Sequence, residues 1–325
     1  MDQNREILNK YKDHFTRINE ELDRGLSSRV ALIEDIANHT LLGQGKRLRP
    51  LLFVLACRLC NYHGEDAYRI STIFEYVHAS SLLHDDVLDN ADTRRKKPSA
   101  NHLWGNHAAV LEGDFLYSKA STIAVETDSL PFMRRVTDTT MQMTEGQILE
   151  LTYTDDWKIG KKEYMEIITA KTAVLISAAC ACGAILSQAG EEVEKSLERF
   201  GRNVGIAFQL MDDVLDYTSS EEMFGKPVGK DLKEGKITLP LIYTLLKLEE
   251  SERKRFADLF KNDRATEHDY RNLTGLVRTN GALDQIRDEA QVYVDEAASC
   301  LTSFPDSPAK RNLLELNQYI IDREY

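Results

Sequence analysis

The pentapeptide Asp-Asp-Val-Leu-Asp occurs twice in the chain, at residues 85–89 and again at residues 212–216. Each copy follows an apolar run typical of a buried helix, and residues i and i+4 of a helix share one face. Each copy therefore places two carboxylates one turn apart beside apolar surface, where charge without a partner costs free energy. Two such motifs predict facing helices that share a strongly positive partner, and clustered divalent metal ions meet that requirement.

The spacing of apolar residues predicts a chain built almost wholly from helices. Apolar side chains recur every three or four residues, strand-like alternation is scarce, and the 325 residues include only 17 glycines and 7 prolines. No flexible linker, repeat or low-complexity tract divides the sequence. We therefore expect an all-α fold, a single domain over residues 1–325, with both acidic motifs at one end of a helical bundle. The predicted helices span residues 3–22, 28–40, 48–60, 66–89, 106–126, 131–152, 161–170, 172–188, 191–218, 237–248, 252–261, 267–279, 282–302 and 308–322.

The net charge of −12 argues against a nucleic acid partner, which requires a basic surface. The N-terminal stretch is charged and amphipathic rather than signal-like, and the longest apolar segment, 172–185, is too short to cross a bilayer. We therefore expect a cytoplasmic protein. Five cysteines form no secreted disulfide framework, and Cys57, Cys60, Cys180 and Cys182 are expected to be buried core thiols.

The six aspartates of the two motifs form a hard-oxygen donor set without cysteine or histidine at ligand spacing. Such donors select Mg²⁺, or the related Mn²⁺, over zinc. No EF-hand pattern is present, so an open site completed by substrate phosphate is expected. One such cluster is as easily a solvated acidic helix end, but two copies, each followed by a basic loop, favour the metal site. The predicted metal ligands are Asp85, Asp86, Asp89, Asp212, Asp213 and Asp216.

Basic residues accompany both acidic motifs. Arg94 and Arg95 follow the first motif, and a lysine-rich loop over 219–235 follows the second. The segment 46–49 adds a lysine and two arginines before an apolar helix, whose N-terminus favours anions. Such side chains are often only solvated charge. Beside metal-type carboxylates, however, they favour a diphosphate held between Mg²⁺ and cations.

Isolated polar residues on apolar helices are further candidates. His78 lies upstream of the first motif and is either an anion donor or a satisfied core histidine. Lys171 opens a very apolar helix, where it must snorkel to solvent or meet an anion. Gln209 precedes the second motif by three residues and lies near the same face. Gln147 and Glu150 are weaker candidates, because an exposed helix face explains them equally well.

Together these motifs resemble those of the trans-isoprenyl diphosphate synthases, also called polyprenyl synthetases. The resemblance covers nearly the whole chain, from the Gly-Lys-Arg-Leu-Arg-Pro segment at 45–50 to residues 319–323. It rests above all on two DDxxD motifs with basic neighbours. It implies an isoprenoid synthase-type fold, a helical bundle around a deep central cavity, usually in a homodimer. It also implies Mg²⁺ ions, three in number, that bridge an allylic diphosphate, with Mn²⁺ as a substitute.

The resemblance also assigns roles to the candidate residues. An allylic prenyl diphosphate is expected to ionise, and the double bond of isopentenyl diphosphate then attacks the cation before a proton is lost. The released diphosphate is expected to take that proton, since the sequence shows no dedicated base. The expected catalytic residues are Asp85, Asp89, Lys171, Gln209 and Asp212. The expected ligands of isopentenyl diphosphate are Lys46, Arg49, His78 and Arg95. The expected ligands of the allylic diphosphate are Arg94, Lys171, Thr172, Gln209, Lys226 and Lys236.

Residues upstream of the first motif predict the length of the product. In this family the prenyl tail grows into the cavity beneath that motif, and short-chain members typically block it with an aromatic side chain. Here Ser80 and Ser81 occupy those positions, followed by Val77 and, deeper, Phe74. Small serines favour products of C30 or longer, with octaprenyl diphosphate, a precursor of quinone side chains, as the first choice. Phe74 could end growth earlier, which keeps geranylgeranyl or farnesyl diphosphate as alternatives.

Two other kinds of protein share some of these features. A class I terpene cyclase also has a first aspartate-rich motif, but it needs no isopentenyl diphosphate site. A non-catalytic partner subunit typically lacks one of the two motifs, whereas this chain has both. Transient membrane contact for release of an insoluble product is also expected. Arg323, near the C-terminus, is a candidate to close over isopentenyl diphosphate.

Overall fold

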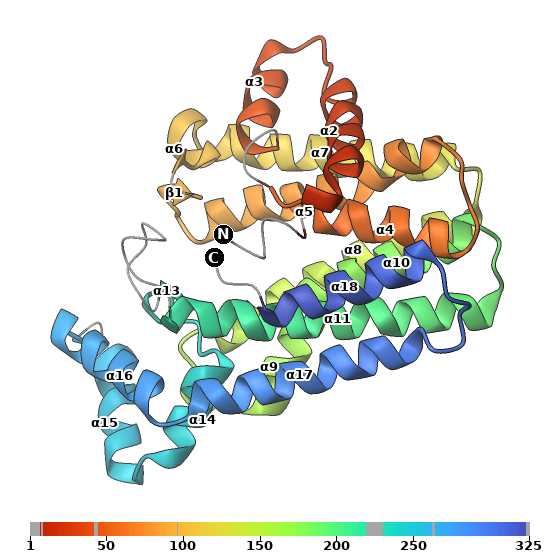
Figure 1. Cartoon of the computed structure of the whole chain (residues 1–325). Coiled ribbons are helices and arrows are strands. Elements are labelled where there is room, and N and C mark those ends of the chain that lie inside the picture. Colours follow the sequence, from red (N-terminus) through yellow and green to blue (C-terminus); the bar gives the residue numbers. More distant parts are fainter. Residues whose placement is uncertain are drawn as a thin grey trace.

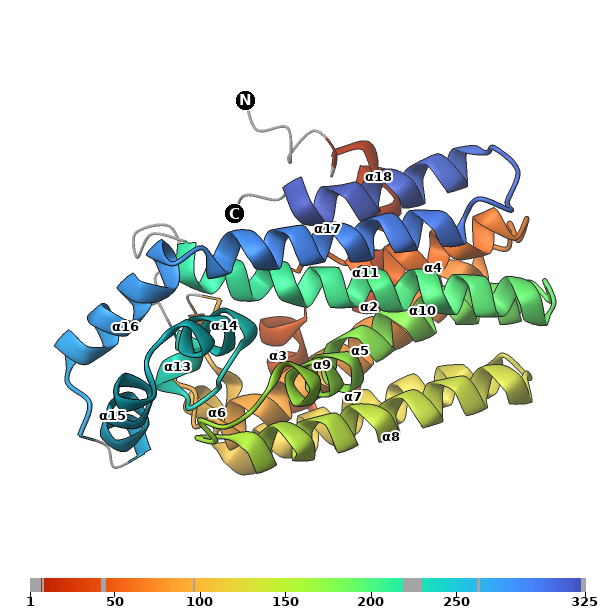
Figure 2. The same cartoon turned by 90° about the horizontal axis from the view of Figure 1, so that it is seen from below.

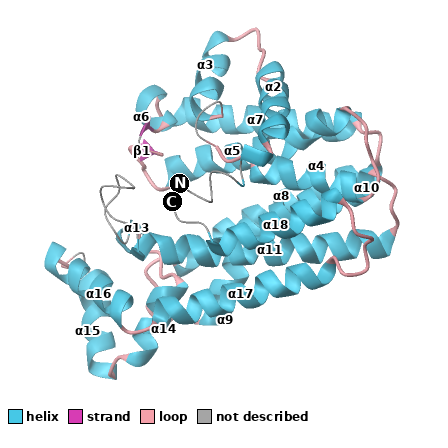
Figure 3. Cartoon of the chain, in the orientation of Figure 1, coloured by secondary structure: helices cyan, strands magenta, loops and turns pink. Residues whose placement is uncertain are grey.

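Helices account for most of the described chain, as the apolar spacing predicts. The computed structural model describes residues 7, 9–41, 45–95, 97–218, 230–261 and 264–322. Figures 1 and 3 show an all-helical bundle with one short hairpin. The elements are α2 (Lys12–Gly25), α3 (Ala31–Thr40), α4 (Leu48–Leu59), α5 (Asp66–Leu88), β1 (Thr93–Arg94), β2 (Lys97–Pro98), α6 (Ala100–Trp104), α7 (Asn106–Glu126), α8 (Leu130–Tyr153), α9 (Lys161–Ile168), the π-helical turn η1 (Thr169–Ala173), α10 (Val174–Leu186), α11 (Glu191–Thr218), α13 (Lys230–Lys233), α14 (Leu239–Lys247), α15 (Glu250–Lys261), α16 (Glu267–Thr279), α17 (Ala282–Cys300) and α18 (Pro308–Asp322).

The longest helices pack side by side around one apolar core. α10 lies along α11, α11 lies along α17, and α5 packs against α7 and α4. In Figure 2, α7 and α8 run together along one edge of the molecule, while α17 and α18 lie on the other side. The short helices α15 and α16 project at one end, next to α14 (Figure 1). This arrangement leaves α5, α8, α10 and α11 facing one another in the middle.

Aromatic and aliphatic side chains fill the bundle between α4, α5 and α8. The ring centroids of Phe53 and Phe74 lie 5.3 Å apart, and Phe132 packs edge-on against Phe53 at 6.2 Å. All three rings are fully buried, and burial of each large apolar side chain contributes about 1.5–3 kcal/mol. This aromatic cluster holds α4, α5 and α8 together below the acidic motifs.

The helix that carries Lys171 continues through the position where the sequence predicts a break. Instead of separate helices at 161–170 and 172–188, α9, η1 and α10 form one run. Its π-helical turn inserts an extra residue, and such turns are frequent at functional sites. Glycines on the neighbouring helices allow the close packing: a Cβ on Gly146 would lie 2.7 Å from the backbone nitrogen of Lys171.

The run Lys161–Leu186 is also longer than the apolar segment expected at 172–185. By length and composition it is sufficient to cross a membrane, but 72% of its most apolar window is buried inside the protein. Buried core helices of soluble folds pass the same test. Its apolar side chains are covered by α4, α8 and α11, so packing within the bundle explains its composition.

Two segments predicted as loops contain short regular elements. The loop at 90–105 forms the β1–β2 hairpin, with Thr93 opposite Pro98, and then the helix α6. The loop at 219–235 contains α13, while residues 219–229 lie outside the described chain. These elements are too short to leave a periodic signal, since a two-residue strand has no alternation to detect. The described part of the first helix, α2, ends at Gly25 rather than at residue 22.

Replacing Gly205 with alanine should destabilise the protein. The added Cβ would lie 2.5 Å from the Cα of Ala173 in the π-helical turn, so α11 must shift away. Overpacking of this kind costs about 1–3 kcal/mol. The measurement is the free energy of unfolding in urea. Gly275→Ala on α16 is the matched control, because its Cβ would meet nothing within 4 Å and alanine favours a helix; equal effects of both changes would contradict the assignment.

Glu112 on α7 is buried, and neither carboxylate oxygen has a hydrogen-bond partner among the described residues. Burial raises the pKa of Glu112 to about 7. The folded chain therefore binds a proton that the unfolded chain releases above its ordinary pKa of 4.5. This side chain stabilises the fold in acid relative to alkaline conditions.

Glu112→Gln should stabilise the protein at pH 8 by roughly 2–3 kcal/mol, since no buried carboxylate remains to ionise. The gain should decline as the pH falls through 7 and vanish below about pH 4.5. Urea unfolding of both proteins across this range measures the difference. Glu20→Gln, on the exposed face of α2, is the control. A difference independent of pH would rule out this origin.

Candidate active site

A cavity of about 1460 Å³ opens between α5, α8, α10 and α11. Most of the polar residues predicted from the sequence line it, although they come from elements far apart in the chain. α18 closes one side with Leu316 and Ile320. The predicted residues in the lining are Lys46, Arg49, Val77, His78, Ser80, Ser81, Asp85, Asp89, Arg94, Arg95, Lys171, Thr172, Gln209, Asp212, Asp213, Asp216 and Lys236.

The first acidic motif lies at the C-terminal end of α5, where two of its three carboxylates face the cavity. The ammonium nitrogen of Lys236 lies 2.9 Å from Asp89, and that of Lys171 lies 3.6 Å from Asp85. Burial raises the pKa of Asp85, and Lys171 partly offsets that effect. The two lysines thus offset part of the negative charge of the wall formed by this motif.

Asp86 points away from the cavity, although its neighbours in the motif face it. It is buried, and its Oδ1 accepts a hydrogen bond of 2.8 Å from Nε of Arg94 as well as one from the terminal guanidinium. Asp86 is absent from the cavity lining. Asp86 therefore orients Arg94, whose guanidinium lies at the cavity wall.

The second motif lies on α11 and forms the opposite wall. Its middle residue, Asp213, is buried and accepts hydrogen bonds from the hydroxyl of Tyr164 at 2.6 Å and from Nε2 of Gln209 at 2.8 Å. Burial raises the pKa of Asp213 well above its ordinary value, and these two donors partly offset the effect. Thr172 donates to Oε1 of Gln209 at 3.0 Å. A chain of hydrogen bonds across α9, η1 and α11 therefore fixes the orientation of the Gln209 amide.

Glu150 on α8 joins the two lysines. Its Oε2 lies 2.6 Å from Nζ of Lys171. Burial lowers the pKa of Lys236, but the negative charge of Glu150, together with Glu234 and Asp89, outweighs burial and raises it above the ordinary value. The sequence ranks Glu150 only as a weak candidate, and it gives no indication of Tyr164 or Glu234. Their roles depend on contacts between distant elements.

The basic segment before α4 combines a buried arginine with two further cations of the cavity lining. Arg47 has a left-handed backbone, with φ of 49°, and is buried. It forms an ion pair of 2.5 Å with Glu75 and donates to Asn19 at 3.0 Å. This buried pair anchors the segment at the edge of the cavity, where Lys46 and Arg49 also belong to the lining.

Arg49 and His78 lie in unusual environments on the side of the cavity next to α4. Nε of Arg49 is buried without a hydrogen-bond acceptor among the described residues. Burial lowers the pKa of His78 well below its ordinary value, and the charges of Arg49 and Arg95 lower it further. His78 is therefore neutral at physiological pH and is suited to a single hydrogen bond rather than to a full positive charge.

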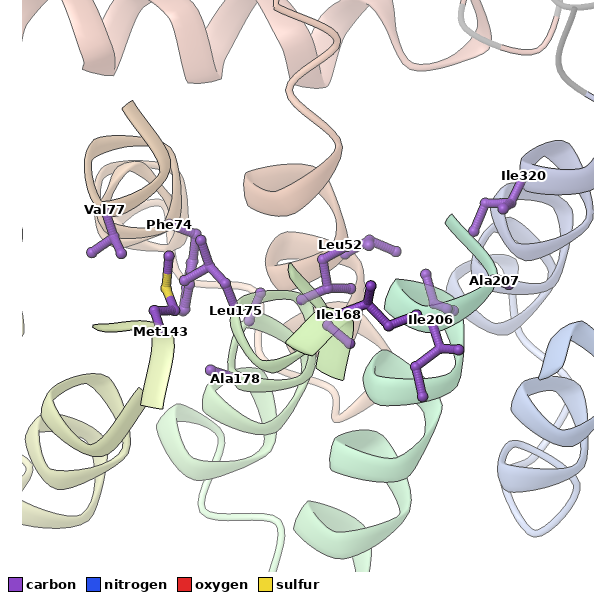
Figure 4. Close-up of a cluster of buried hydrophobic side chains, with 14 of the residues drawn as sticks. Leu52, Phe74, Val77, Met143, Ile168, Leu175, Ala178, Ile206, Ala207 and Ile320 are labelled. Atoms are coloured by element: carbon purple, nitrogen blue, oxygen red, sulfur yellow. The ribbon is translucent and has the colours of Figure 1, made fainter. Parts of the chain in front are cut away.

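Small and apolar side chains form the wall beneath the first motif. Val77, Ser80 and Ser81 line the cavity together with Met143 and Leu175, which the sequence did not single out. Phe74 is not part of the lining, because its ring is packed against Phe53. Figure 4 shows Val77, Met143 and Leu175 converging with Phe74 from three helices.

Two predicted residues, Lys226 and Arg323, lie outside the described residues.

The carboxylates fit an open divalent-metal site rather than a closed one. Within the described ranges, no three carboxylate, imidazole or thiol groups converge closely enough to hold a metal ion unaided. Asp85 and Asp89 on one wall and Asp212 and Asp216 on the other nevertheless line the same cavity with hard oxygen donors. Mg²⁺ usually takes few protein ligands and keeps waters and phosphate oxygens, so this donor set suits it.

The sequence profile of one family, described as Polyprenyl synthetase, matches residues 30–277. The chain belongs to the polyprenyl synthetase family. It is 37% identical over 309 residues to octaprenyl diphosphate synthase of Escherichia coli (strain K12), covering 94% of this chain and 95% of the relative. It is 36% identical over 286 residues to geranylgeranyl diphosphate synthase of Methanosarcina mazei, covering 86% of each.

Solved structures of polyprenyl synthases share the fold. A polyprenyl synthase from Caulobacter crescentus CB15, crystallised with calcium and isoprenyl diphosphate, superposes with a TM-score of 0.93 at 34% identity, covering 99% of this chain and 98% of that one. The all-α isoprenoid synthase fold expected from the resemblance is confirmed. The chain is a prenyltransferase of a family that depends on divalent metal ions.

Glu150→Gln should lower kcat/KM about 10- to 100-fold, because Lys171 loses a charge-assisted hydrogen bond that holds it at the wall. Steady-state incorporation of labelled isopentenyl diphosphate measures the effect. Glu145→Gln, on the exposed side of the same helix, is the matched control and should retain activity. Wild-type kinetics in the Glu150 variant would contradict its role as a positioning residue.

Proposed function

We propose that the enzyme extends an allylic diphosphate by successive isopentenyl diphosphate units to a product of C30 or longer, with octaprenyl diphosphate as the favoured product. The observation that carries this proposal is one cavity with two distinct ends. Two acidic walls and a set of cations form the polar end, while serines and aliphatic side chains form the apolar end. The polar end suits the binding of two diphosphates, and the apolar end suits the binding of a growing hydrocarbon tail.

The allylic diphosphate is expected to bind between the two acidic walls. Arg94, Lys171 and Lys236 supply positive charge there, and their partners Asp86, Glu150 and Glu234 hold them in place. When the bond between carbon and diphosphate oxygen breaks, negative charge grows on the leaving group. Fixed cations stabilise that charge more strongly in the transition state than in the ground state.

Three Mg²⁺ ions are expected to complete this end, with Mn²⁺ able to replace them. Asp85 and Asp89 would hold them on one side and Asp212 and Asp216 on the other, while Asp213 supports the second wall through Gln209. The metal would supply Lewis-acid stabilisation of the diphosphate as its charge develops.

Isopentenyl diphosphate is expected to bind on the side of α4. Lys46, Arg49 and Arg95 provide charge, and the buried Nε of Arg49 gains the acceptor that it lacks among the described residues. Neutral His78 adds one hydrogen bond. An anion at this point relieves the cost of a buried donor, which is about 1–3 kcal/mol.

The reacting carbons are expected to lie between the two diphosphates, beside Thr172 and Gln209. Attack by the isopentenyl double bond forms the new carbon–carbon bond, and loss of a proton to the released diphosphate restores a double bond. The hydrogen bond from Thr172 and the one to Asp213 leave the Gln209 amide no freedom to rotate. The apolar walls below exclude water, which would quench the cation.

We also propose that the enzyme acts in the cytoplasm as a homodimer, with transient membrane contact when the product leaves. Nine of the fifteen large apolar side chains exposed in the described chain lie on α7 and α8. A concentrated apolar face of this kind favours association with another protein surface. The insolubility of a long prenyl product favours release at a bilayer.

Purified enzyme with farnesyl diphosphate, labelled isopentenyl diphosphate and Mg²⁺ should yield products of C30 or longer, resolved by chromatography. Ser81→Phe should shorten them, because an aromatic ring would occupy the cavity wall beneath Asp85. Ser251→Phe, on the exposed face of α15, is the control and should leave product length unchanged. A wild-type ceiling at C15 or C20 would overturn the long-chain proposal, and product from farnesyl diphosphate alone would indicate a cyclase.

A further inference from the structure

The active-site residue Lys236 follows the short helix α13, which has only four residues. The backbone nitrogen of Gly235 donates a hydrogen bond to the carbonyl of Leu232 at 3.2 Å. The nitrogen of Lys236 donates to the carbonyl of Asp231 at 2.9 Å. These are the two bonds of a Schellman motif, and the φ of 73° at Gly235 is the left-handed conformation that the motif uses. A single helical turn is not stable by itself, so the position of Lys236 depends on the contacts that hold α13.

Helix α16 contacts α13 from outside the cavity. The ammonium nitrogen of Lys233, the last residue of α13, lies 2.7 Å from Oε1 of Glu267 and 5.3 Å from the centre of the Tyr270 ring. Figure 1 shows α15 and α16 projecting at the end of the molecule where α13 lies. The side chain of Glu267 is 69% exposed, so its ion pair is weak and is screened by salt. The contact between the ammonium group and the ring is therefore the more persistent of the two.

The connection between α8 and α9 also contacts the end of α13. The backbone nitrogen of Asp155 donates to the carbonyl of Gly235 at 2.9 Å. The same connection carries Trp157, whose ring centroid lies 5.0 Å from that of Phe260 on α15. Phe260 in turn packs edge-on against Tyr270, with 4.8 Å between the centroids. Three aromatic rings thus join this connection to α16, and the two supports of α13 form one continuous frame.

Within the described chain, the residues of this frame are absent from the cavity lining. They are Asp155, Trp157, Lys233, Phe260, Glu267 and Tyr270. Lys236 and Glu234, by contrast, belong to the lining, and Nζ of Lys236 lies 2.8 Å from Glu234 and 2.9 Å from Asp89. The frame can therefore influence a substrate only through the residues that it positions.

We propose that Tyr270 and Lys233 are positioning residues for Lys236, and that α15 and α16 form the outer support of this lysine. The inference rests on the proposed function, in which Lys236 faces the allylic diphosphate. Lys233 lies three residues before Lys236, so a shift of α13 would move both. A displacement of about 1 Å in a group that stabilises developing charge can lower the rate about 100-fold, because the stabilisation depends on distance.

Tyr270→Leu removes the ring beside the ammonium group and should lower kcat/KM for farnesyl diphosphate about tenfold, through misplacement of Lys236. The Michaelis constant for isopentenyl diphosphate should not change, because its expected site lies on the side of α4. Tyr270→Phe keeps the ring and should retain wild-type kinetics. Tyr62→Leu, at a partly buried tyrosine that precedes α5, is the matched control and should also retain them. Wild-type kinetics in a folded Tyr270→Leu enzyme would overturn the inference.

A double-mutant cycle shows whether the effect passes through Lys236. In the background of Lys236→Ala, Tyr270→Leu should cause no further loss of kcat/KM, because the group that it misplaces is already gone. A merely structural role would give the same loss in both backgrounds. A further loss of about tenfold in the Lys236→Ala enzyme would therefore overturn the inference.

Lys233→Met tests the other partner of the contact, at an exposed residue where substitution has little effect on folding. It should lower kcat/KM for farnesyl diphosphate to a similar extent, whereas Lys233→Arg, which also stacks on an aromatic ring, should retain activity. The double variant with Tyr270→Leu should lose no more than either single variant. Losses that multiply would indicate that Lys233 acts independently of the ring, and would overturn the inference.

The outcomes separate this inference from the proposed function. Absence of prenyl product from the wild-type enzyme would overturn the proposed function. Prenyl product from the wild type together with unchanged kinetics in Tyr270→Leu and Lys233→Met would overturn only the positioning role. Circular dichroism verifies the fold of each variant. If Tyr270→Leu does not fold, Lys233→Met in the wild-type and Lys236→Ala backgrounds still decides.

Discussion

The structure depends on the neutralisation of many carboxylates at the end of an apolar cavity. Two helices, α5 and α11, bring aspartates to facing walls, where burial raises the pKa of Asp85 and Asp213. Isolated buried charge would oppose folding, so each wall is accompanied by donors or cations. Lys171 and Lys236 lie against the first wall, and Tyr164 and Gln209 donate to the second. These partners offset only part of the negative charge in the cavity, so the facing carboxylates remain suited to divalent cations.

Close packing of the helices fixes the positions of these charged and polar groups. The π-helical turn Thr169–Ala173 directs Lys171 and Thr172 into the cavity from a helix that is otherwise buried. Gly146 and Gly205 allow α8 and α11 to approach its backbone, where a Cβ would collide. On the other side, the buried pair of Arg47 and Glu75 fixes the segment before α4. Rigid supports of this kind hold charged groups where a cation and a leaving group form, which is the general basis of electrostatic catalysis.

The sequence was a good guide to the helices and to the type of chemistry, and a weaker guide to single residues. The 3.6-residue period located most helices within a few positions, because each buries a wide apolar face. It missed the β1–β2 hairpin and α6, which are too short for a period, and it divided one helix at Lys171. Asp85 and Asp86 were both predicted to bind metal, and only Asp85 was expected to be catalytic; Asp85 faces the cavity, and Asp86 holds Arg94. Phe74 was a candidate to form a floor and end growth earlier, but it is absent from the cavity lining and packs against Phe53.

The sequence by itself determined the all-helical fold, the hard-oxygen donor set and the paired clusters of acid and base, because periodicity and residue type are local properties. The tertiary structure decided which groups meet. Glu150 became the partner of Lys171 because α8 lies beside the π-helical turn, and no spacing along the chain encodes that contact. Contacts between remote elements depend on the packing of the whole bundle, and that is where the specificity of this site resides.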